Sequence, residues 1–465
     1  MTVPTWVQDA VFYHIFPDRF ANSDLSNDPV NRQTWGSPPT STLFQGGDLR
    51  GIIQKFDYLI DLGITALYLN PIFHSSSNHR YNTIDYFKID PKLGDINEFH
   101  VLLDIAHRHG VKVILDGVFN HCGRGFFAFV DLLENREYSP YTNWFHVLHF
   151  PIDAYSPGEA KDYLAWWRIK SLPKFNTNTL EVRKYLLSVA GYWIEQGADG
   201  WRLDVPNEID DDSFWAEFRH VVKSINQDAY LLGEIWNADP RWVGDQHFDG
   251  LMNYPFRDCL LRLLQTKGGD TVLCTHKLES LLTIFSSENA YAMYLLLGSH
   301  DTERILTKLE NDIQKVKLAY LLQFAYPGAP AIYYGDEIGM VGGKDPDCRG
   351  AFPWDTNLWN HELRQWVKAL VSARKQYSAL RRGTYLPVLG DDHDRCFAFA
   401  RVLADESILA VINASPTRRE LRLPVSALNW SDERIVHNLF GKEEYVISAS
   451  SVEVLLPAWS GVWLH

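Results

Sequence analysis

Short runs of hydrophobic residues recur along the chain up to about residue 337, and polar or amphipathic sequence follows each of them. Runs of this length, rich in β-branched and aromatic residues, predict buried strands. They lie at residues 10–17, 66–71, 111–121, 200–205, 229–236, 251–254, 291–301 and 331–337. Amphipathic segments such as residues 180–197, whose apolar residues follow helical spacing, lie between several of them. Buried strands that alternate with helices form parallel sheets, so these units predict an α/β fold, a closed (β/α)8 TIM barrel.

Two segments depart from this alternation. Residues 122–175 are rich in aromatic residues and prolines and show little periodicity, which predicts a subdomain inserted after the third strand. Beyond about residue 385, short runs of alternating polarity are separated by polar turns, which predicts a C-terminal all-β sandwich domain. The expected organisation is therefore a barrel of residues 1–121 and 176–384, an inserted subdomain B of residues 122–175 and a C-terminal domain of residues 385–465.

Composition and charge narrow the class of protein. Of the 465 residues, 46% are hydrophobic and 14% aromatic, which is ample for a globular interior. The formal net charge of −14 argues against nucleic acid or an anionic membrane as a partner. A neutral or cationic ligand would not be repelled by this negative charge.

The cysteines and the apolar segments indicate the compartment. The five cysteines are scattered, odd in number and free of C-x-x-C spacing, namely Cys122, Cys259, Cys274, Cys348 and Cys396. This pattern fits a reducing compartment. The N-terminal residues lack a basic start and a long apolar run, and Gln323, Pro327 and Pro330 interrupt the most apolar later stretch. We therefore expect a cytoplasmic protein with no membrane segment.

Polar residues gather where several predicted strands end. The motifs are "DGVFNH" (116–121), "GWRLDVPNE" (200–208), "GEIW" (233–236) and "GSHD" (298–301). A barrel carries its chemistry at these strand ends, so Asp204, Glu234 and Asp301 should share one rim. A single acid there could be a cap or part of a loop salt bridge. Three acids together are costly unless chemistry uses them.

Two carboxylates that face each other across a pocket are the equipment of glycoside hydrolysis. One must remain ionised and attack the anomeric carbon, and the other must protonate the leaving oxygen. Arg202 lies two residues before Asp204, on the same side of an extended strand, and should favour its ionised form. An internal barrel ion pair is the alternative interpretation. The apolar neighbours Ile235 and Trp236 should desolvate Glu234 and raise its pKa.

The four motifs, in this order, resemble the conserved segments of the α-amylase family of glycoside hydrolases (family 13). The resemblance runs from about residue 6 to the C-terminus. Three further stretches resemble the neopullulanase, cyclomaltodextrinase and maltogenic amylase subgroup, namely "SSSNHRYNTIDYF" (75–87), "LPKFN" (172–176) and "YYGDEIGMVGGKDPDCRGAFPW" (333–354). By this resemblance, Asp204 is the nucleophile, Glu234 the general acid/base and Asp301 the stabiliser of the transition state, while Arg202 orients the nucleophile.

The resemblance also implies sugar-binding side chains around these acids, which are His121, His300, Tyr81, His79, Asp116, Asp345 and Arg349, with Trp236 and Glu208 on the leaving-group side. His121 and His300 would hold hydroxyls at the cleavage site, and Tyr81 would stack below that sugar. Asp345 and Arg349 would bind the next sugar toward the non-reducing end. Asp116 would anchor the end of the third strand.

A structural metal site is also expected near the N-terminus. The stretches "FANSDLSNDP" (20–29) and "GGDLRG" (46–51) offer oxygen ligands and no cysteine, which suits a hard cation. From the residues alone, a polar loop with Asx turns is an alternative. The resemblance implies a structural Ca²⁺ bound by Asn22, Asp24, Asn27, Asp28, Gly46 and Asp48.

The chain departs from the subgroup in several places. Many members carry an N-terminal β-domain that contributes to a dimer and narrows the entrance of the active site, whereas this sequence begins almost directly at the first predicted strand. We therefore expect any homodimer to form without that domain, and a more open cleft could admit branched glucans and α-1,6 cleavage (debranching). Asn82 stands where relatives often have aspartate, and Pro206 where a smaller residue is common.

The leading hypothesis is a retaining glycoside hydrolase that forms a covalent glucosyl–enzyme intermediate. It would cleave α-1,4- or α-1,6-glucosidic bonds, or both, in maltodextrins, cyclodextrins, pullulan or branched glucans. A glucosyl transferase or isomerase would use the same intermediate, and a non-catalytic glucan-binding protein could share the fold. A metallohydrolase built on Asp116, His121, His300 and Asp301 is a further alternative, but no H-x-H or H-E-x-x-H spacing supports it.

Overall fold

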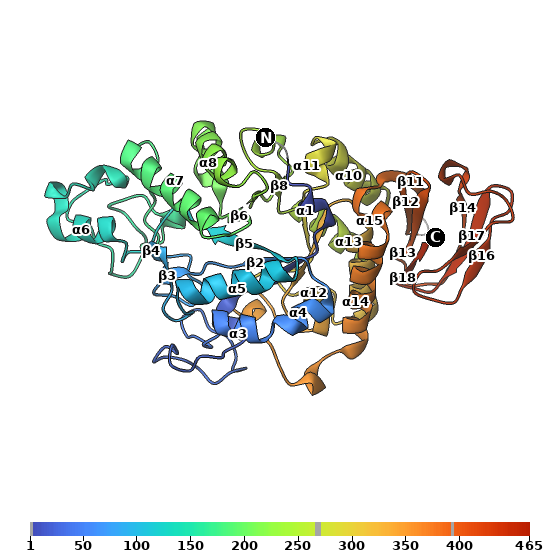
Figure 1. Cartoon of the computed structure of the whole chain (residues 1–465), viewed down its shortest axis with the longest axis horizontal. Helices are drawn as coiled ribbons and strands as arrows, with labels where there is room; N and C mark the ends of the chain where they lie inside the picture. The colour runs from blue at the N-terminus through green and yellow to red at the C-terminus, as the bar shows by residue number, and fades with distance from the viewer. Residues whose placement is uncertain (1–2, 266–270, 392–394) are drawn as a thin grey trace.

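The centre of the molecule is a barrel of eight parallel strands (Figure 1). The computed structural model describes residues 3–265, 271–391 and 395–465. The barrel strands are β1 (Phe12–Ile15), β2 (Ala66–Leu69), β5 (Lys112–Gly117), β6 (Gly200–Leu203), β7 (Tyr230–Gly233), β8 (Gly250–Leu251), β9 (Tyr294–Leu296) and β10 (Ala329–Tyr333). They pair in the order β8-β7-β6-β5-β2-β1-β10-β9. Each overlaps one predicted hydrophobic run, so the predicted (β/α)8 fold class is confirmed.

The barrel closes at a seam between β8 and β9. Met252, directly after β8, forms a parallel bridge with Tyr294, and the Asn253 N–H donates to the Tyr294 carbonyl at 2.9 Å. Gly250 lies so close to the segment before β9 that an added Cβ would be 2.3 Å from the Ala292 carbonyl oxygen. The run predicted at 251–254 was too long, because Asn253 caps a helix that begins at Tyr254. Thus β8 is a two-residue strand.

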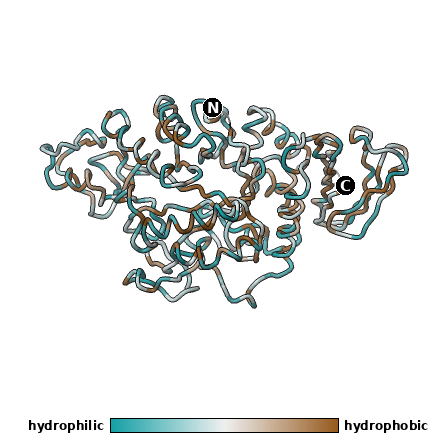
Figure 2. Tube along the Cα trace, viewed as in Figure 1, coloured by the Kyte–Doolittle hydropathy of each residue, from teal (hydrophilic) through white to brown (hydrophobic). Residues whose placement is uncertain are grey.

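Helices surround the barrel, and its strands are buried on both faces, as the central hydrophobic trace in Figure 2 illustrates. The helices are α1 (Trp6–Asp9), α2 (Pro17–Phe20), α3 (Leu49–Gln54), α4 (Phe56–Leu62), α5 (Ile96–Arg108), α7 (Leu180–Glu195), α8 (Asp212–Ile225), α9 (Tyr254–Leu264), α10 (Thr271–Thr283), α11 (Ser287–Ala290), α12 (Ile305–Lys308), α13 (Ile313–Ala325), α14 (His361–Gln376) and α15 (Ser378–Arg382). Side chains that accept backbone N–H groups begin several of them, as Asp95 does for α5 and Asp211 for α8.

The loops contain short 3₁₀ helices of three residues each. They are η1 (Arg136–Tyr138), η2 (Thr142–Trp144), η3 (Trp166–Arg168), η4 (Pro206–Glu208), η5 (Pro240–Trp242), η6 (Asp336–Ile338), η7 (Asp347–Arg349), η8 (Thr356–Leu358) and η9 (Ser426–Leu428). Several directly follow barrel strands, so they help to shape the mouth of the barrel. η4 follows β6 and η6 follows β10.

Two segments project from the barrel between β2 and α7. The antiparallel hairpin of β3 (Phe73–Ser75) and β4 (Thr83–Ile89) precedes α5 and was not predicted. The insertion after β5 contains α6 (Phe127–Asn135), η1, η2, η3 and isolated bridges such as Phe145 with Phe175. Its interior is largely aromatic, with Phe129, Phe145 and Tyr163 in contact. This packing of rings explains why the hydrophobic pattern there shows little periodicity.

The C-terminal part is all-β. One sheet pairs β11 (Thr384–Asp391), β12 (Cys396–Leu403), β13 (Glu406–Asn413) and β18 (Ser460–Leu464), and two smaller sheets pair β14 (Arg419–Pro424) with β17 (Ser451–Leu456) and β15 (Ile435–His437) with β16 (Glu444–Val446). All these pairs are antiparallel. The sheets share a hydrophobic core. In Figure 1 this part and the inserted subdomain lie at opposite ends of the molecule. The residue boundaries of the three parts stay predictions.

Candidate active site

The predicted acids lie at the carboxyl ends of the barrel strands. Asp116 is inside β5, Asp204 and Glu234 directly follow β6 and β7, and Asp301 follows β9. The Asp204 N–H donates to the Gly117 carbonyl and the Glu234 N–H to the Leu203 carbonyl, both at 3.0 Å. These hydrogen bonds continue the parallel pairing past the strand ends. The backbone of the barrel therefore fixes both carboxylates at the same rim.

Arg202 is the centre of the site. Its side chain is fully buried, and its Nη1 donates to Asp116 Oδ1 at 2.8 Å and to Asp204 Oδ1 at 2.9 Å. Its Nη2 forms an ion pair with Glu234 Oε1 at 2.8 Å. Asp204 and Glu234 therefore flank one guanidinium group. The structure brings together the two acids on which the glycosidase hypothesis depends.

The protonation of the two acids follows from burial and from Arg202. Burial raises the pKa of Glu234 to about 7, with Asp301 adding to the effect and Arg202 opposing it. Burial also raises the pKa of Asp204, and the Arg202 cation works against this rise. Arg202 pairs with Asp204, as the sequence indicated, and the same cation also faces Asp116 and Glu234. One positive charge among three acids favours a single proton shared by Asp204 and Glu234 near neutral pH.

Asp301 lies in a more polar position, with its side chain 32% exposed. Its Oδ2 is 2.9 Å from His300 Nε2, and its Oδ1 is 3.1 Å from Arg349 Nη2. Burial would raise the pKa of Asp301, but His300 and Arg349 outweigh it and hold this pKa below its usual range. Arg349 also pairs with Asp345 at 3.0 Å. Asp301 is thus a carboxylate at neutral pH, whereas the Asp204–Glu234 pair retains a proton.

The Tyr81 hydroxyl is held by a buried polar network. It donates to Asp116 Oδ2 at 2.7 Å, lies 2.6 Å from His300 Nε2 and accepts from Asn70 Nδ2 at 2.9 Å. The sequence hypotheses missed Asn70, which also contacts His14 Nε2 through its Oδ1 at 2.8 Å. The signal was present, because Asn70 is a polar residue at the end of the run predicted at 66–71. The network fixes the plane of the Tyr81 ring.

Two histidines at the mouth are neutral bases. Burial lowers the pKa of His79 and of His121 to about 3, so neither carries a charge at neutral pH. The Tyr81 N–H donates to His79 Nδ1 at 3.1 Å. The buried His121 Nε2 has no hydrogen-bond partner among the described residues. It is therefore free for a ligand hydroxyl.

The remaining predicted residues lie on the loops after β6 and β7 and at the tip of the β3–β4 hairpin. The half-exposed Trp236 ring stacks on Tyr254, with centroids 3.8 Å apart. Glu208 lies 3.6 Å from Lys174 Nζ, a contact that the sequence did not indicate. Asn82 accepts from the Ser75 hydroxyl at 2.8 Å, so it has a local role in the hairpin. Pro206 is buried and begins η4.

The two stretches predicted to hold calcium bring several oxygen-bearing side chains together. Asn22 donates to Asp28 Oδ1 at 2.6 Å, and the side-chain oxygens of Asn22 and Asn27 are buried without a partner among the described residues. A Cβ on Gly46 would lie 2.4 Å from Asp28 Oδ1, so only glycine permits this approach. These oxygens fit a hard cation. In contrast, both oxygens of Asp48 accept backbone N–H groups, and Asp24 Oδ1 accepts from Ser26.

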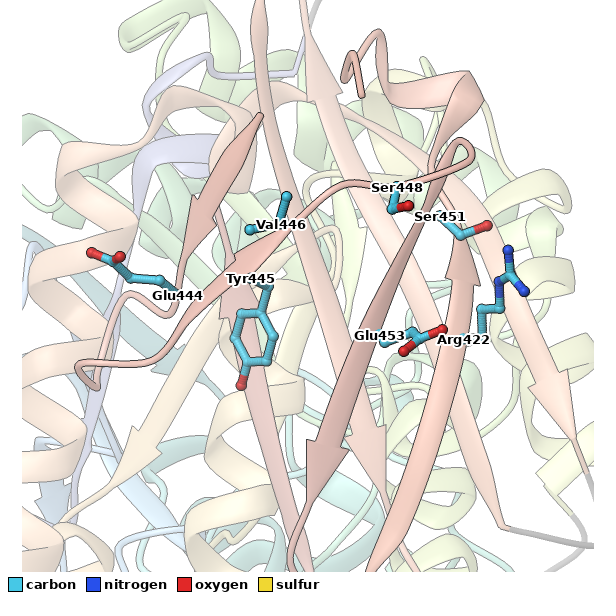
Figure 3. Close-up of a pocket in the computed structure, with 7 residues that line it drawn as sticks. All are labelled: Arg422, Glu444, Tyr445, Val446, Ser448, Ser451 and Glu453. Carbon is cyan, nitrogen blue, oxygen red and sulfur yellow. The ribbon is translucent and has the colours of Figure 1, made fainter. Parts of the chain in front are cut away.

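Outside the barrel mouth, the described residues also form a groove in the C-terminal part. This groove of about 330 Å³ is lined by Arg422, Tyr445 and Glu453, among others, and contains none of the predicted site residues (Figure 3). Within residues 3–265, 271–391 and 395–465, no three His, Cys, Asp or Glu side chains form a group suited to a metal ion. No helix in these ranges is long and apolar enough to cross a membrane.

The fold and the site define a class of protein. Paired carboxylates that share a proton at the mouth of a (β/α)8 barrel are typical of a glycoside hydrolase. Comparison with known proteins agrees, since residues 14–395 match the catalytic domain of the α-amylase family. The chain belongs to this family and is a retaining hydrolase of α-glucosidic bonds.

Three relatives illustrate the match. A cyclomaltodextrinase of Geobacillus thermopakistaniensis is 44% identical over 99% of this chain and 77% of its own length. The structure of a cyclic α-maltosyl-(1→6)-maltose hydrolase from Arthrobacter globiformis aligns with a TM-score of 0.90 at 38% identity and covers all of both chains. A debranching enzyme from Nostoc punctiforme aligns with a TM-score of 0.88 at 37% identity, over 100% of this chain and 99% of its own.

Proposed function

We propose that this protein hydrolyses α-1,4- and α-1,6-glucosidic bonds in cyclic, linear and branched maltodextrins, with Asp204 and Glu234 as the reacting side chains. The observation that carries the proposal is their position on one buried guanidinium, with a proton retained by the pair. The names of the relatives support the substrate range, because one is a cyclomaltodextrinase, one a hydrolase of a cyclic α-1,6-linked maltosyl-maltose and one a debranching enzyme.

In the first step, protonated Glu234 donates its proton to the glycosidic oxygen as the Asp204 carboxylate attacks the anomeric carbon. The bond from that carbon to the leaving oxygen breaks, and an ester forms between the sugar and Asp204. Asp301, ionised through His300 and Arg349, stabilises the positive charge that develops on the sugar ring. A neutral sugar gains less from this charge than the transition state does.

In the second step, Glu234 is a carboxylate and removes a proton from a water molecule. The water oxygen attacks the anomeric carbon, and the bond to Asp204 breaks. Two displacements at one carbon restore the original configuration. Arg202 remains charged throughout and offsets the carboxylate released on Asp204.

The neighbouring side chains position the sugar. Tyr81, held by its hydroxyl, presents its ring to the sugar at the cleavage site, and neutral His121 accepts or donates one hydrogen bond to a hydroxyl. Arg349 and Asp345 bind the next sugar toward the non-reducing end. Trp236 offers an aromatic face to the leaving sugar.

A glucosyl transferase would form the same ester and differ only in the acceptor. A sugar hydroxyl would then replace water in the second step. Product analysis at high acceptor concentration separates the two outcomes. The raised pKa of Glu234 is typical of a catalytic acid, and a protein that only bound glucans would not require it.

The substrate range is tested by a product profile on cyclodextrin, pullulan, linear maltodextrin and a branched glucan, measured side by side. We expect cleavage of cyclodextrin and linear maltodextrin, together with loss of α-1,6 linkages from the branched glucan. Release of short products with no loss of α-1,6 linkages would restrict the activity to α-1,4 bonds. Binding without release of reducing sugar on any of the four substrates would overturn the proposal.

We further propose that a structural Ca²⁺ is bound by the side chains of Asn22, Asn27 and Asp28 with the Gly46 carbonyl. The support is two buried side-chain oxygens without a partner among the described residues, those of Asn22 and Asn27, together with the close approach of Gly46 to Asp28. Calcium at one hundred times its Kd should stabilise the fold by about 2.7 kcal/mol. The measurement is Tm with EDTA and with added calcium. We expect added calcium to raise Tm by several degrees in wild type, but not in Asn27→Ala, and we expect magnesium not to reproduce this rise. Equal Tm values with and without calcium would contradict the proposal.

We also propose that the protein acts in the cytoplasm and that any homodimer forms without using the N-terminal β-domain of the subgroup. The five cysteines support a reducing compartment, since they are odd in number, scattered along the chain without C-x-x-C spacing, and buried. Sedimentation of the purified chain tests the oligomeric state directly.

A further inference from the structure

We propose that Trp166 and Trp167 form a second contact surface for the glucan, here called the tryptophan platform, which binds a glucosyl unit beyond the sugars at the cleavage site. The proposal rests on the proposed function and adds a preference for longer chains. The platform belongs to the inserted subdomain, which lies at one end of the molecule in Figure 1. It would discriminate chain length without taking part in bond cleavage.

The platform begins at the active site. The Trp166 ring stacks on His121, with centroids 5.6 Å apart and planes at 21°. Trp167 stacks on Trp166 at 4.4 Å with planes at 9°. Three nearly parallel rings therefore run outward from the mouth. Trp167 is two ring layers beyond His121, so a sugar on it is not the sugar attached to Asp204.

The outer ring is exposed at a conformational cost. Trp167 is 75% exposed, and its backbone adopts a left-handed conformation with φ 47°. Arg168 follows with φ 60°. Non-glycine residues in this region cost of order 1 kcal/mol each, and burial of the ring in the protein does not offset that cost here. A strained backbone that presents a large apolar ring to solvent indicates a role outside folding.

The turn is nevertheless fixed. The Trp166 N–H donates to the Leu172 carbonyl at 3.0 Å, the Arg168 N–H to the Ala165 carbonyl at 3.0 Å and the Ala160 N–H to the Arg168 carbonyl at 2.8 Å. These hydrogen bonds hold the turn on both sides of Trp167. A rigid aromatic face loses little entropy on binding, which suits a recognition surface.

The chemistry around the platform fits a pyranose. A glucosyl unit has an apolar face of C–H bonds and a rim of hydroxyls, so it stacks on an indole while its rim needs polar partners. Arg168 and Glu159 form an exposed ion pair at 3.0 Å beside Trp167. Leu164 and Ile169, which are near Trp167 in the sequence, also have exposed apolar side chains. A neutral ligand also suits the acidic chain better than an anionic partner does.

The test compares Trp167→Ala with wild type on two substrates, a long linear maltodextrin and p-nitrophenyl α-maltoside. Because the platform lies away from the scissile bond, its contact is equal in the ground and transition states, and its loss should raise KM without changing kcat. We expect KM for the long chain to rise roughly tenfold. KM for p-nitrophenyl α-maltoside should be the same in Trp167→Ala and in wild type, since we expect this substrate to be too short to reach Trp167.

A matched control is Tyr138→Ala, which removes an aromatic ring that is 86% exposed in η1 of the same subdomain. It should leave KM unchanged on both substrates. Trp167→Phe keeps an aromatic face and should recover most of the affinity for the long chain. This variant also separates loss of the ring from damage to the turn, which would lower kcat on both substrates.

Three results would overturn the platform. They are an unchanged KM of Trp167→Ala for the long chain, an equal rise in KM for both substrates, and a change in sedimentation without a change in KM, which would make Trp167 a subunit contact. If wild type cleaves neither substrate, the proposed function fails. The platform is then tested separately by affinity electrophoresis in amylose, where Trp167→Ala should migrate faster than wild type.

Discussion

Replacement of Asp204 by asparagine is expected to lower kcat/KM on maltodextrins by roughly 10⁴-fold or more, in line with the loss of other covalent nucleophiles. An amide cannot form the ester with the anomeric carbon, although its size preserves the packing around Arg202. Initial rates of reducing-sugar release give the value. Circular dichroism and Tm should match wild type.

The control for this variant is Asp210→Asn. Asp210 is an acid on the same loop, but its side chain is 72% exposed and pairs with Arg241. Exposed pairs of this kind contribute little to stability, so activity should stay near wild type. A second check is Asp204→Ala with added azide, which can enter the vacated space and yield a glucosyl azide of inverted configuration. Near-wild-type turnover by Asp204→Asn would contradict the assignment of the nucleophile.

The second large effect concerns Glu234 and pH. Its pKa of about 7 means that the proton needed by the leaving oxygen is present below pH 7 and is lost above it. We therefore expect kcat/KM to fall about tenfold for each pH unit above this value. Glu234→Gln should lower kcat/KM by roughly 10³-fold and abolish this alkaline limb.

A substrate with a good leaving group sharpens the test. The 2,4-dinitrophenolate of a 2,4-dinitrophenyl α-glucoside leaves without being protonated. Glu234→Gln should therefore form the glucosyl ester from this substrate with a much smaller loss of rate than from maltodextrin. An equal loss on this substrate and on maltodextrin would show that Glu234 does not act as the acid. An alkaline limb that persists in Glu234→Gln would assign the titration to another group.

The strands and the acids could be predicted from sequence because both depend on local pattern. Barrel strands are buried on both faces, so they read as hydrophobic runs, and the acids that follow them stand out. The β3–β4 hairpin could not be found in this way, since β3 has three residues and the connecting residues 76–82 are mostly polar. The two-residue β8 was overextended for a related reason, because the following apolar residue Tyr254 begins a helix.

The sharing of Arg202 among three acids lies beyond local pattern. Asp116 and Arg202 are register partners across β5 and β6, and Glu234 is reached from the next strand. Such contacts depend on the stagger of neighbouring strands, which one sequence does not reveal. The same holds for Asn70, whose partners Tyr81 and His300 come from distant segments.

The close packing of β8 against the segment before β9 connects the active site to Gly250, a residue that does not contact the sugar. The Cβ of an alanine at position 250 would lie 2.3 Å from the Ala292 carbonyl oxygen and 2.8 Å from the Tyr230 hydroxyl, so it would force these segments apart. A wider gap at this join is expected to shift β9, which precedes Asp301, relative to β7, which precedes Glu234. A glycine that does not contact the sugar thereby permits the close approach of β8 to the segment before β9.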